Sequence, residues 1–160
     1  MLSQNKFQLM AFILFVVTLG LSILLFKPEP TGSIFSDQSN SVLLGEQSAC
    51  DAAMQRCELR LENGRNISFK MSSPVISLKP VEFSVLVHGY KVQPDIVSVI
   101  FTMSGMDMGW NQFPMQLGDN GWHGTGMLPV CSSERRDWMA TVIFHLNKQT
   151  YRAAFHFTSQ

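Results

Sequence analysis

The sequence lacks most of the motifs that carry enzyme chemistry. It has no C-x-x-C or H-x-x-x-H spacing, which argues against the common kinds of zinc site. It has no glycine-rich phosphate loop, no carboxylate pair within a motif and no nucleophile–base pair at a recognisable spacing. Twelve basic and twelve acidic residues give zero net charge without a basic run, so no feature points to nucleic acid. These absences predict a protein that is neither an enzyme nor a nucleic-acid binder.

What the sequence does have, first, is a long uncharged apolar run from Phe7 to Phe26. A helix of this length spans roughly 30 Å, the thickness of the hydrocarbon core of a bilayer. The run is longer than the apolar region of a cleavable signal peptide, and no A-x-A follows it. We therefore expect residues 1–27 to form an uncleaved anchor with one transmembrane helix.

The charges that flank the run predict its orientation. Lys6 precedes it, whereas Lys27 after it is followed closely by Glu29, which favours a cytoplasmic N-terminus. In a bacterium, the rest of the chain would then lie in the periplasm, tethered to the inner membrane by a single span. Residues 28–49 are rich in Ser, Pro, Gly and Gln, which is typical of a flexible linker. Residues 50–160 suit a single domain.

The domain is expected to be all-β, because short apolar runs alternate with turn residues. Val81, Phe83, Val85 and Val87 share one face at a period of two residues. Turn sequences follow several other runs, and they predict hairpins at 62–64 and 147–148 and a turn at 118–121. A polar turn is expected at 135–137, and a short helix is possible only over residues 47–56. The expected architecture is an Ig-like β-sandwich of about 7–8 antiparallel strands. Its strands are predicted over residues 57–61, 67–71, 81–87, 96–103, 112–117, 122–127, 137–145 and 151–157.

The segment from Phe101 to Gly109 contains Met103, Met106 and Met108 within six residues. Thioether, imidazole and thiolate groups select soft metals, Cu(I) above all. Two glycines in the segment favour a loop that turns the three sulfurs toward a common point. The alternative is that these methionines fill gaps in the core.

Further ligands would come from elsewhere in the sequence. His123 lies beside a turn and is a plausible fourth ligand, although an exposed histidine with no such role is the alternative. The cysteines are Cys50, Cys57 and Cys131, and an exported domain would oxidise a suitable pair. All three pairings are open from sequence alone.

One pairing is favoured by geometry. If residues 50–57 are an intact helix, the two Cα atoms at its ends lie about 10 Å apart, too far for a disulfide. If strand directions alternate, Cys57, Cys131 and the end of the 96–103 strand lie at the same pole. We therefore expect a Cys57–Cys131 disulfide. The third cysteine would be a thiol, a metal ligand or a link to a partner.

A family resemblance rests on several of these elements. They are the N-terminal anchor, Met106-Asp107-Met108-Gly109, Gly-Trp-His-Gly at 121–124, Leu-Pro-Val-Cys at 128–131 and the strand with Trp138. Together they resemble the FixH/YtkA-like group of membrane-anchored, exported Ig-like domains, over residues 57–157. The resemblance implies a sandwich fold and a role in copper handling or cytochrome oxidase assembly.

The hypothesis from sequence is therefore a periplasmic domain that binds Cu(I) through Met103, Met106 and Met108, with His123 or a cysteine. It would assist a respiratory oxidase or exchange copper with a copper chaperone. The rival hypothesis is a metal-free interaction module that acts on another membrane protein. A third is an exported thiol-redox enzyme that uses the odd cysteine.

Overall fold

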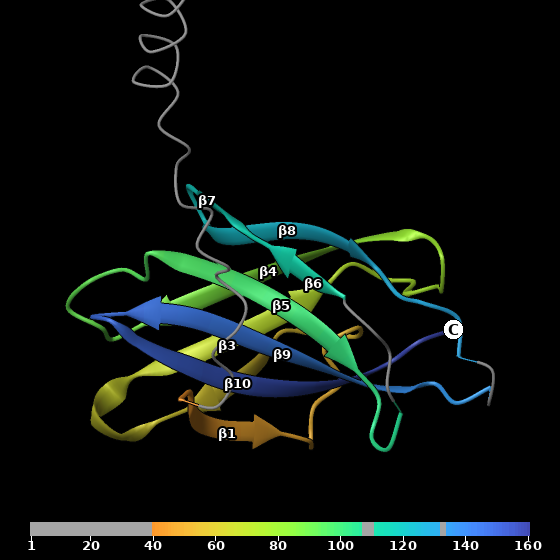
Figure 1. Cartoon of the computed structure of the whole chain (residues 1–160), viewed down its shortest axis with the longest axis horizontal. Helices are drawn as coiled ribbons and strands as arrows, with labels where there is room; N and C mark the ends of the chain where they lie inside the picture. Colours follow the sequence, from red (N-terminus) through yellow and green to blue (C-terminus); the bar gives the residue numbers. More distant parts are fainter. Residues whose placement is uncertain (1–39, 107–110, 132–133) are drawn as a thin grey trace, which may run out of the picture. The chain divides into compact units, whose positions relative to one another are not determined.

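The computed structural model describes residues 40–106, 111–131 and 134–160. Within them the chain forms two five-stranded sheets and no α-helix, an all-β, sandwich-like fold (Figure 1). The first sheet has the order β1-β10-β9-β5-β6 and the second β2-β3-β4-β8-β7. The strands are β1 Val42–Gln47, β2 Cys57–Arg60, β3 Asn66–Met71, β4 Pro80–His88, β5 Ile96–Thr102, β6 Gln112–Pro114, β7 Gln116–Gly118, β8 Gly121–Met127, β9 Asp137–Leu146 and β10 Gln149–Thr158.

The predicted anchor, residues 1–27, lies outside the described residues. So does most of the predicted linker. Among the described residues, no helix has the length and apolar character needed to cross a membrane.

The turns that separate the long strands are where the sequence predicts them. Asn147 and Lys148 both have positive φ, as the tight hairpin between β9 and β10 requires. Asn63 and Gly64 have positive φ in the connection between β2 and β3. Gly118 pairs with Gly121 and closes the hairpin between β7 and β8. The predicted hairpins at 62–64 and 147–148 and the predicted turn at 118–121 are therefore confirmed.

Two parts of the strand prediction are wrong. The predicted linker 28–49 contains a strand, because β1 pairs with β10 in parallel, with Val42 opposite Tyr151. The sheets are therefore not antiparallel throughout. The single strand predicted at 112–117 is two short strands in different sheets. Pro114, which has no N–H, ends β6, and the next residue, Met115, is buried at the crossing between the sheets.

The possible helix at 47–56 does not form, and the expected Cys57–Cys131 disulfide is wrong. Ala52 donates its N–H to the carbonyl of His156 and accepts from the N–H of Met71, so this segment bonds to both sheets. Its internal backbone bonds, from Met54 and Gln55 to the carbonyl of Asp51, close a turn and do not continue into a helix. Its turns bring the Cα atoms of Cys50 and Cys57 to 5.7 Å, and these two cysteines form the disulfide. The spacing that excludes a disulfide within a helix does not apply to a turn.

The core lies between the two sheets and is rich in phenylalanine. Phe69 of β3 packs against Phe155 of β10 with ring centroids 5.5 Å apart. Phe83 of β4 meets Phe101 of β5 edge to face, also at 5.5 Å. These pairs join one sheet to the other. On β5 the inward face continues from Val97, Val99 and Phe101 to Met103, at the end of the sandwich that carries the candidate site.

Candidate functional site

The end of β5 forms a tight turn that holds two methionines side by side. The N–H of Met106 donates to the carbonyl of Met103 at 3.3 Å, and the two residues form an antiparallel bridge. Gly105 has φ 75°, a conformation that suits glycine at the third position of such a turn. Residues paired across an antiparallel bridge extend their side chains to the same face. Met103 is 3% exposed and Met106 is half-buried against the core.

Asn111 holds the strand in place where the chain returns to it. Its side-chain oxygen accepts from the N–H of Phe101 at 2.9 Å, and its amide donates to the carbonyl of the same residue. The side chain therefore acts as one more strand residue on the edge of β5. This contact pairs the last part of β5, two residues before the Met103–Met106 turn begins.

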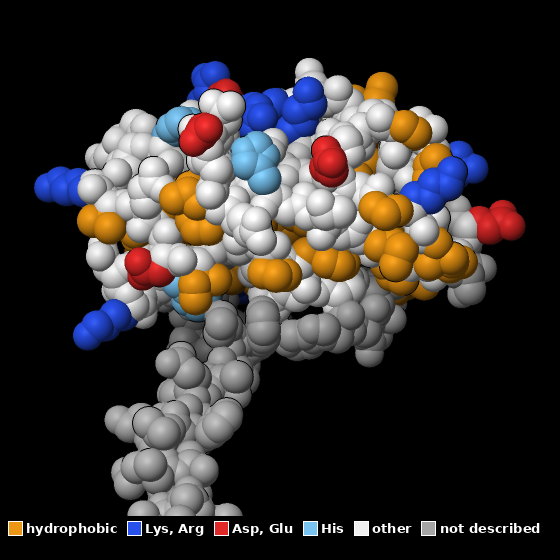
Figure 2. All heavy atoms as spheres, turned by 90° about the horizontal axis from the view of Figure 1, so that it is seen from above, with side chains coloured by type: hydrophobic (Ala, Val, Ile, Leu, Met, Phe, Trp, Pro, Cys, Tyr) orange, Lys and Arg blue, Asp and Glu red, His pale blue; other side chains and the backbone are white. Residues whose placement is uncertain are grey.

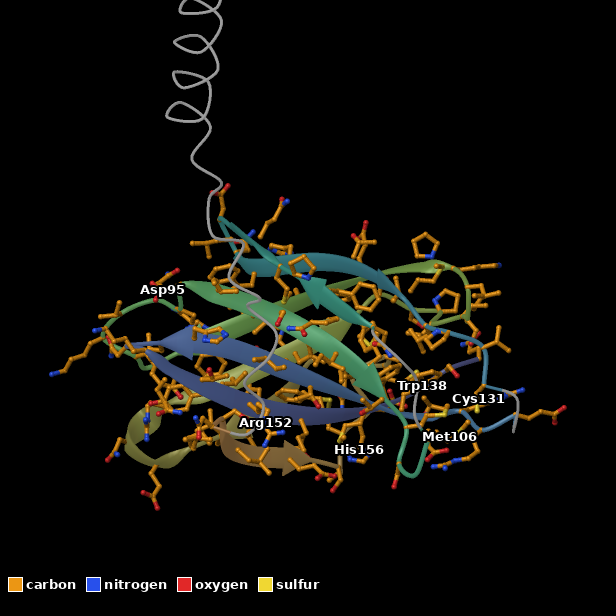
Figure 3. All side chains as sticks on the ribbon, viewed as in Figure 1. Asp95, Met106, Cys131, Trp138, Arg152 and His156 are labelled. Carbon is orange, nitrogen blue, oxygen red and sulfur yellow. A yellow bond between two sulfur atoms is a disulfide. The ribbon has the colours of Figure 1, made fainter. Side chains whose placement is uncertain are left out.

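The loop that follows β8 brings a third sulfur to the turn. The thiol of Cys131 donates to the thioether sulfur of Met106, with the two sulfurs 3.5 Å apart. Figure 3 shows both residues, with Trp138, at one end of the sandwich. Two sulfurs each about 2.3 Å from one ion lie about 3.8 Å apart in tetrahedral geometry, so the observed spacing is close to that of a shared ion. A site whose ligands are a thiolate and a thioether suits Cu(I).

Strand alternation predicted that Cys131 and the methionines would lie at a common pole, and the register places them there. Thr102 pairs with Met139 at the start of β9, and Met127 at the end of β8 pairs with Pro80. The backbone of Gln160, beyond β10, bonds to Val75 next to these ends. The contact with Met106 itself could not be deduced from alternation.

The other predicted ligands are not part of this group. His123 lies on β8 after the buried Trp122, so it points to the outer face of the second sheet. There it is exposed and lines a shallow groove with Glu82, Gln116 and Thr125. Met108 lies outside the described residues. In the part of the chain that the structure describes, no three His, Cys, Asp or Glu side chains gather in a group that could hold a metal ion.

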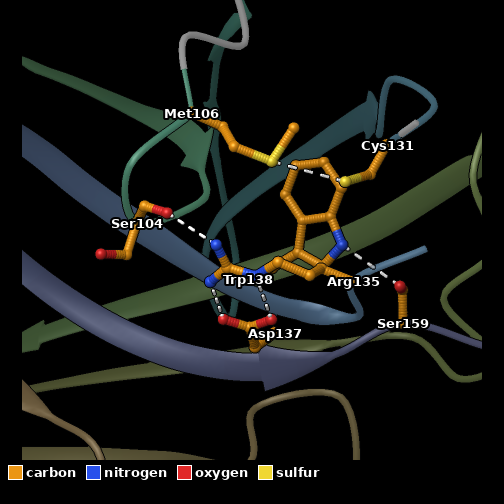
Figure 4. A network of polar contacts seen from close by, with 7 residues as sticks. All are labelled: Ser104, Met106, Cys131, Arg135, Asp137, Trp138 and Ser159. Atoms are coloured by element: carbon orange, nitrogen blue, oxygen red, sulfur yellow. Dashed lines mark hydrogen bonds and ion pairs between the residues drawn. The ribbon is translucent and has the colours of Figure 1, made fainter. Parts of the chain in front are cut away.

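A charged side chain that was not among the predicted site residues connects the two loops. Arg135 donates through Nε to the carboxylate of Asp137 at 2.9 Å and makes a second contact with the other carboxylate oxygen. Its Nη1 donates to the carbonyl of Ser104, in the turn between the methionines, at 2.8 Å (Figure 4). In the sequence it stands only as part of the polar turn at 135–137, which carries no signal for the bond to Ser104.

Trp138 is buried at the same end of the sandwich as Met106 and Cys131 (Figure 3). The side chain is 1% exposed, and its indole N–H donates to the hydroxyl of Ser159 at 3.1 Å. The ring stacks on Phe157 with centroids 6.3 Å apart. Because the indole nitrogen donates to Ser159, the ring can be buried at this end of the sandwich with no unpaired polar atom.

The ion pair sets the charge of the site. The hydrogen bond from Arg135 lowers the pKa of the Asp137 carboxyl below its ordinary value of 3.8. The same bond raises the pKa of Arg135, to which Cys131 adds a smaller effect in the same direction. At neutral pH the guanidinium and the carboxylate therefore neutralise one another beside the two sulfurs.

This lowered pKa predicts how the ion pair responds to acid. A carboxyl whose folded-state pKa is depressed contributes stability above its unfolded-state value and loses it as pH falls through the folded-state value. The pair should therefore be intact at pH 5 and break below 3.8. In an NMR titration, the Asp137 carboxyl carbon should show a midpoint below 3.8, and Arg135→Gln should raise it. A midpoint at or above 3.8 in the unaltered chain would contradict the pairing.

In comparisons with known proteins, no family model matches the chain, and neither a curated protein nor a solved structure matches it significantly.

Proposed function

We propose that this chain binds Cu(I) at the Met106–Cys131 pair and takes part in copper handling for a respiratory oxidase. The observation that carries the proposal is the 3.5 Å contact between a thioether and a thiol on two loops at the rim of the core. Met103 shares a face with Met106 and adds a buried thioether beside it. Of the ligands in the sequence hypothesis, the proposal keeps Met103, Met106 and the cysteine, which supplies the anionic ligand, and it leaves out His123.

The donor set fits the chemistry of Cu(I). A thioether needs no deprotonation, whereas the thiol of Cys131 must release its proton to solvent when the ion binds. Binding would therefore weaken as pH falls, but the methionines would still be available. The thiolate and Cu(I) together carry no net charge, which suits a half-buried position.

The proposed cellular setting is inferred from the sequence. The apolar run at residues 7–26 supports a single-span anchor in a bacterial inner membrane, with the β domain in the periplasm. The two sheets support an Ig-like sandwich, as does the resemblance to FixH/YtkA-like domains. In this setting the protein would act by holding copper and passing it to an oxidase or a copper chaperone, without catalysing a reaction.

The test is a Cu(I) titration of the full chain in detergent, against a chromophoric chelator. Met106→Leu should weaken binding about tenfold, roughly 1.4 kcal/mol, and Cys131→Ser by about a hundredfold. Met54→Leu is the matched control, because Met54 is 76% exposed and lies in the turns after Cys50. If Met106→Leu and Cys131→Ser bind Cu(I) as tightly as the unaltered chain, the proposal is wrong.

A metal-free interaction module is the second candidate. Leu78, a bulky residue with φ 59°, is 60% exposed, and its N–H donates to the carbonyl of Leu128. Met127 and Val130 are also exposed near this contact, and Figure 2 shows apolar side chains among the polar ones on one face. If the sulfurs prove dispensable in cells while Leu78→Ser abolishes function, this candidate is favoured.

A further inference from the structure

Arg135 lies on one loop of the candidate site and bonds to the other. It belongs to the loop that also carries Cys131, and it donates to the carbonyl of Ser104, between Met103 and Met106. Its other nitrogens hold Asp137 at the start of β9. The guanidinium thus bonds to a backbone carbonyl and to both carboxylate oxygens, in directions that its planar fork fixes and a rotatable ammonium does not.

The strength of these contacts suggests what they do. Both side chains of the ion pair are largely accessible, 39% for Arg135 and 64% for Asp137, so the pair adds little to stability. A thiol is also a weak hydrogen-bond donor, whereas contacts to a guanidinium are charge-assisted. The Arg135 contacts are therefore suited to fixing the distance between the loops and not to holding the fold together.

We propose that Arg135 is the positioning residue of the Cu(I) site. It holds the Met103–Met106 turn against the Cys131 loop and so brings the sulfurs together. This inference rests on the proposed function. Arg135 does not itself touch the ion. It sets the separation of the two sulfurs through the carbonyl of Ser104, and Asp137 keeps its charge from repelling a cation.

The two partners of Arg135 have separable effects. Arg135→Gln removes the bond to Ser104 and the charge together, so the sulfurs of Met106 and Cys131 are no longer held at a fixed separation. Asp137→Asn leaves a cation that can still bond to Ser104, but its charge is no longer neutralised beside a bound Cu(I). Both changes should weaken binding, the first mainly by faster release of the ion and the second mainly by slower capture.

The experiment measures Cu(I) release from the full chain to excess chelator, followed by the ultraviolet absorption of the copper–thiolate bond. Arg135→Gln should speed release about tenfold. Arg135→Lys should release Cu(I) at a rate between those of Arg135→Gln and the unaltered chain, because an ammonium keeps the charge but lacks the fixed planar fork. Arg136→Gln is the matched control, since Arg136 is the next residue and its side chain is also exposed. Melting temperatures without metal should agree within a few degrees.

The outcomes separate the two proposals. If the unaltered chain shows no copper–thiolate absorption, the proposed function fails, and the role of Arg135 fails with it. If the unaltered chain binds Cu(I) and Arg135→Gln releases it at the same rate, only the role of Arg135 is wrong. If Arg135→Gln melts far below the unaltered chain, Arg135 is a structural residue and the proposal is wrong. It is also wrong if the folded Asp137→Asn variant captures Cu(I) as fast as the unaltered chain does.

Discussion

Replacing Phe101 with alanine is expected to lower the free energy of unfolding by about 3–5 kcal/mol. The ring is fully buried and joins three others, with centroid distances of 5.5 Å to Phe83, 5.4 Å to Phe113 and 5.6 Å to Phe157. Phe83 belongs to the opposite sheet, so the lost ring would leave a cavity between the layers. Urea unfolding should show a lower midpoint with an unchanged slope.

A control separates this effect from the loss of any large apolar side chain. Leu117 lies on β7 and is 54% exposed, so Leu117→Ala should stay within about 0.5 kcal/mol of the unaltered chain. A loss of less than about 1 kcal/mol for Phe101→Ala would show that Phe101 does not hold the sheets together. Since Phe101 is two residues before Met103, this variant should also weaken Cu(I) binding.

Removing the Cys50–Cys57 disulfide is the second large change. The crosslink has a sequence separation of 7, and the chain-entropy relation gives about 2–3 kcal/mol for so short a loop. The double variant Cys50→Ala and Cys57→Ala should therefore unfold at a lower urea concentration. Alanine is chosen because Cys57 is 1% exposed, and a serine hydroxyl there would be buried.

The single variant Cys131→Ala distinguishes the pairing in the structure from the one the sequence favoured. It should leave the disulfide intact and cost far less than the double variant. If Cys57 were joined to Cys131, Cys131→Ala would be the costly change and Cys50→Ala would be nearly silent. Peptide mapping of the non-reduced chain identifies the pair directly.

The all-β fold and most strands could be predicted from local patterns. The period of two residues along 81–87 identified β4, and paired turn residues located the hairpins. β1 was missed because Val42–Gln47 has no alternating pattern of its own and becomes a strand only beside β10. Parallel pairing between distant segments leaves no local signal in either of them.

The candidate site was predictable only in part. Alternation along β8 could have excluded His123, because its neighbour Trp122 had to be buried. The contact of Cys131 with Met106 depends on how two loops pack, which no spacing encodes. Arg135 was missed for the same reason, since its bond to Ser104 joins residues 31 positions apart.

The sulfur contact also joins the two layers of the fold. Met106 follows β5 of one sheet, and Cys131 follows β8 of the other, 25 residues along the chain. An ion held by both sulfurs would act as a reversible crosslink between the sheets. It would bind only the closed sandwich, so each filled site would add RT ln(1 + [Cu]/Kd) to the work of pulling the sheets apart. Bound copper would then stabilise the fold as well as being transferred, and the copper-free protein would unfold more readily than the copper-bound one.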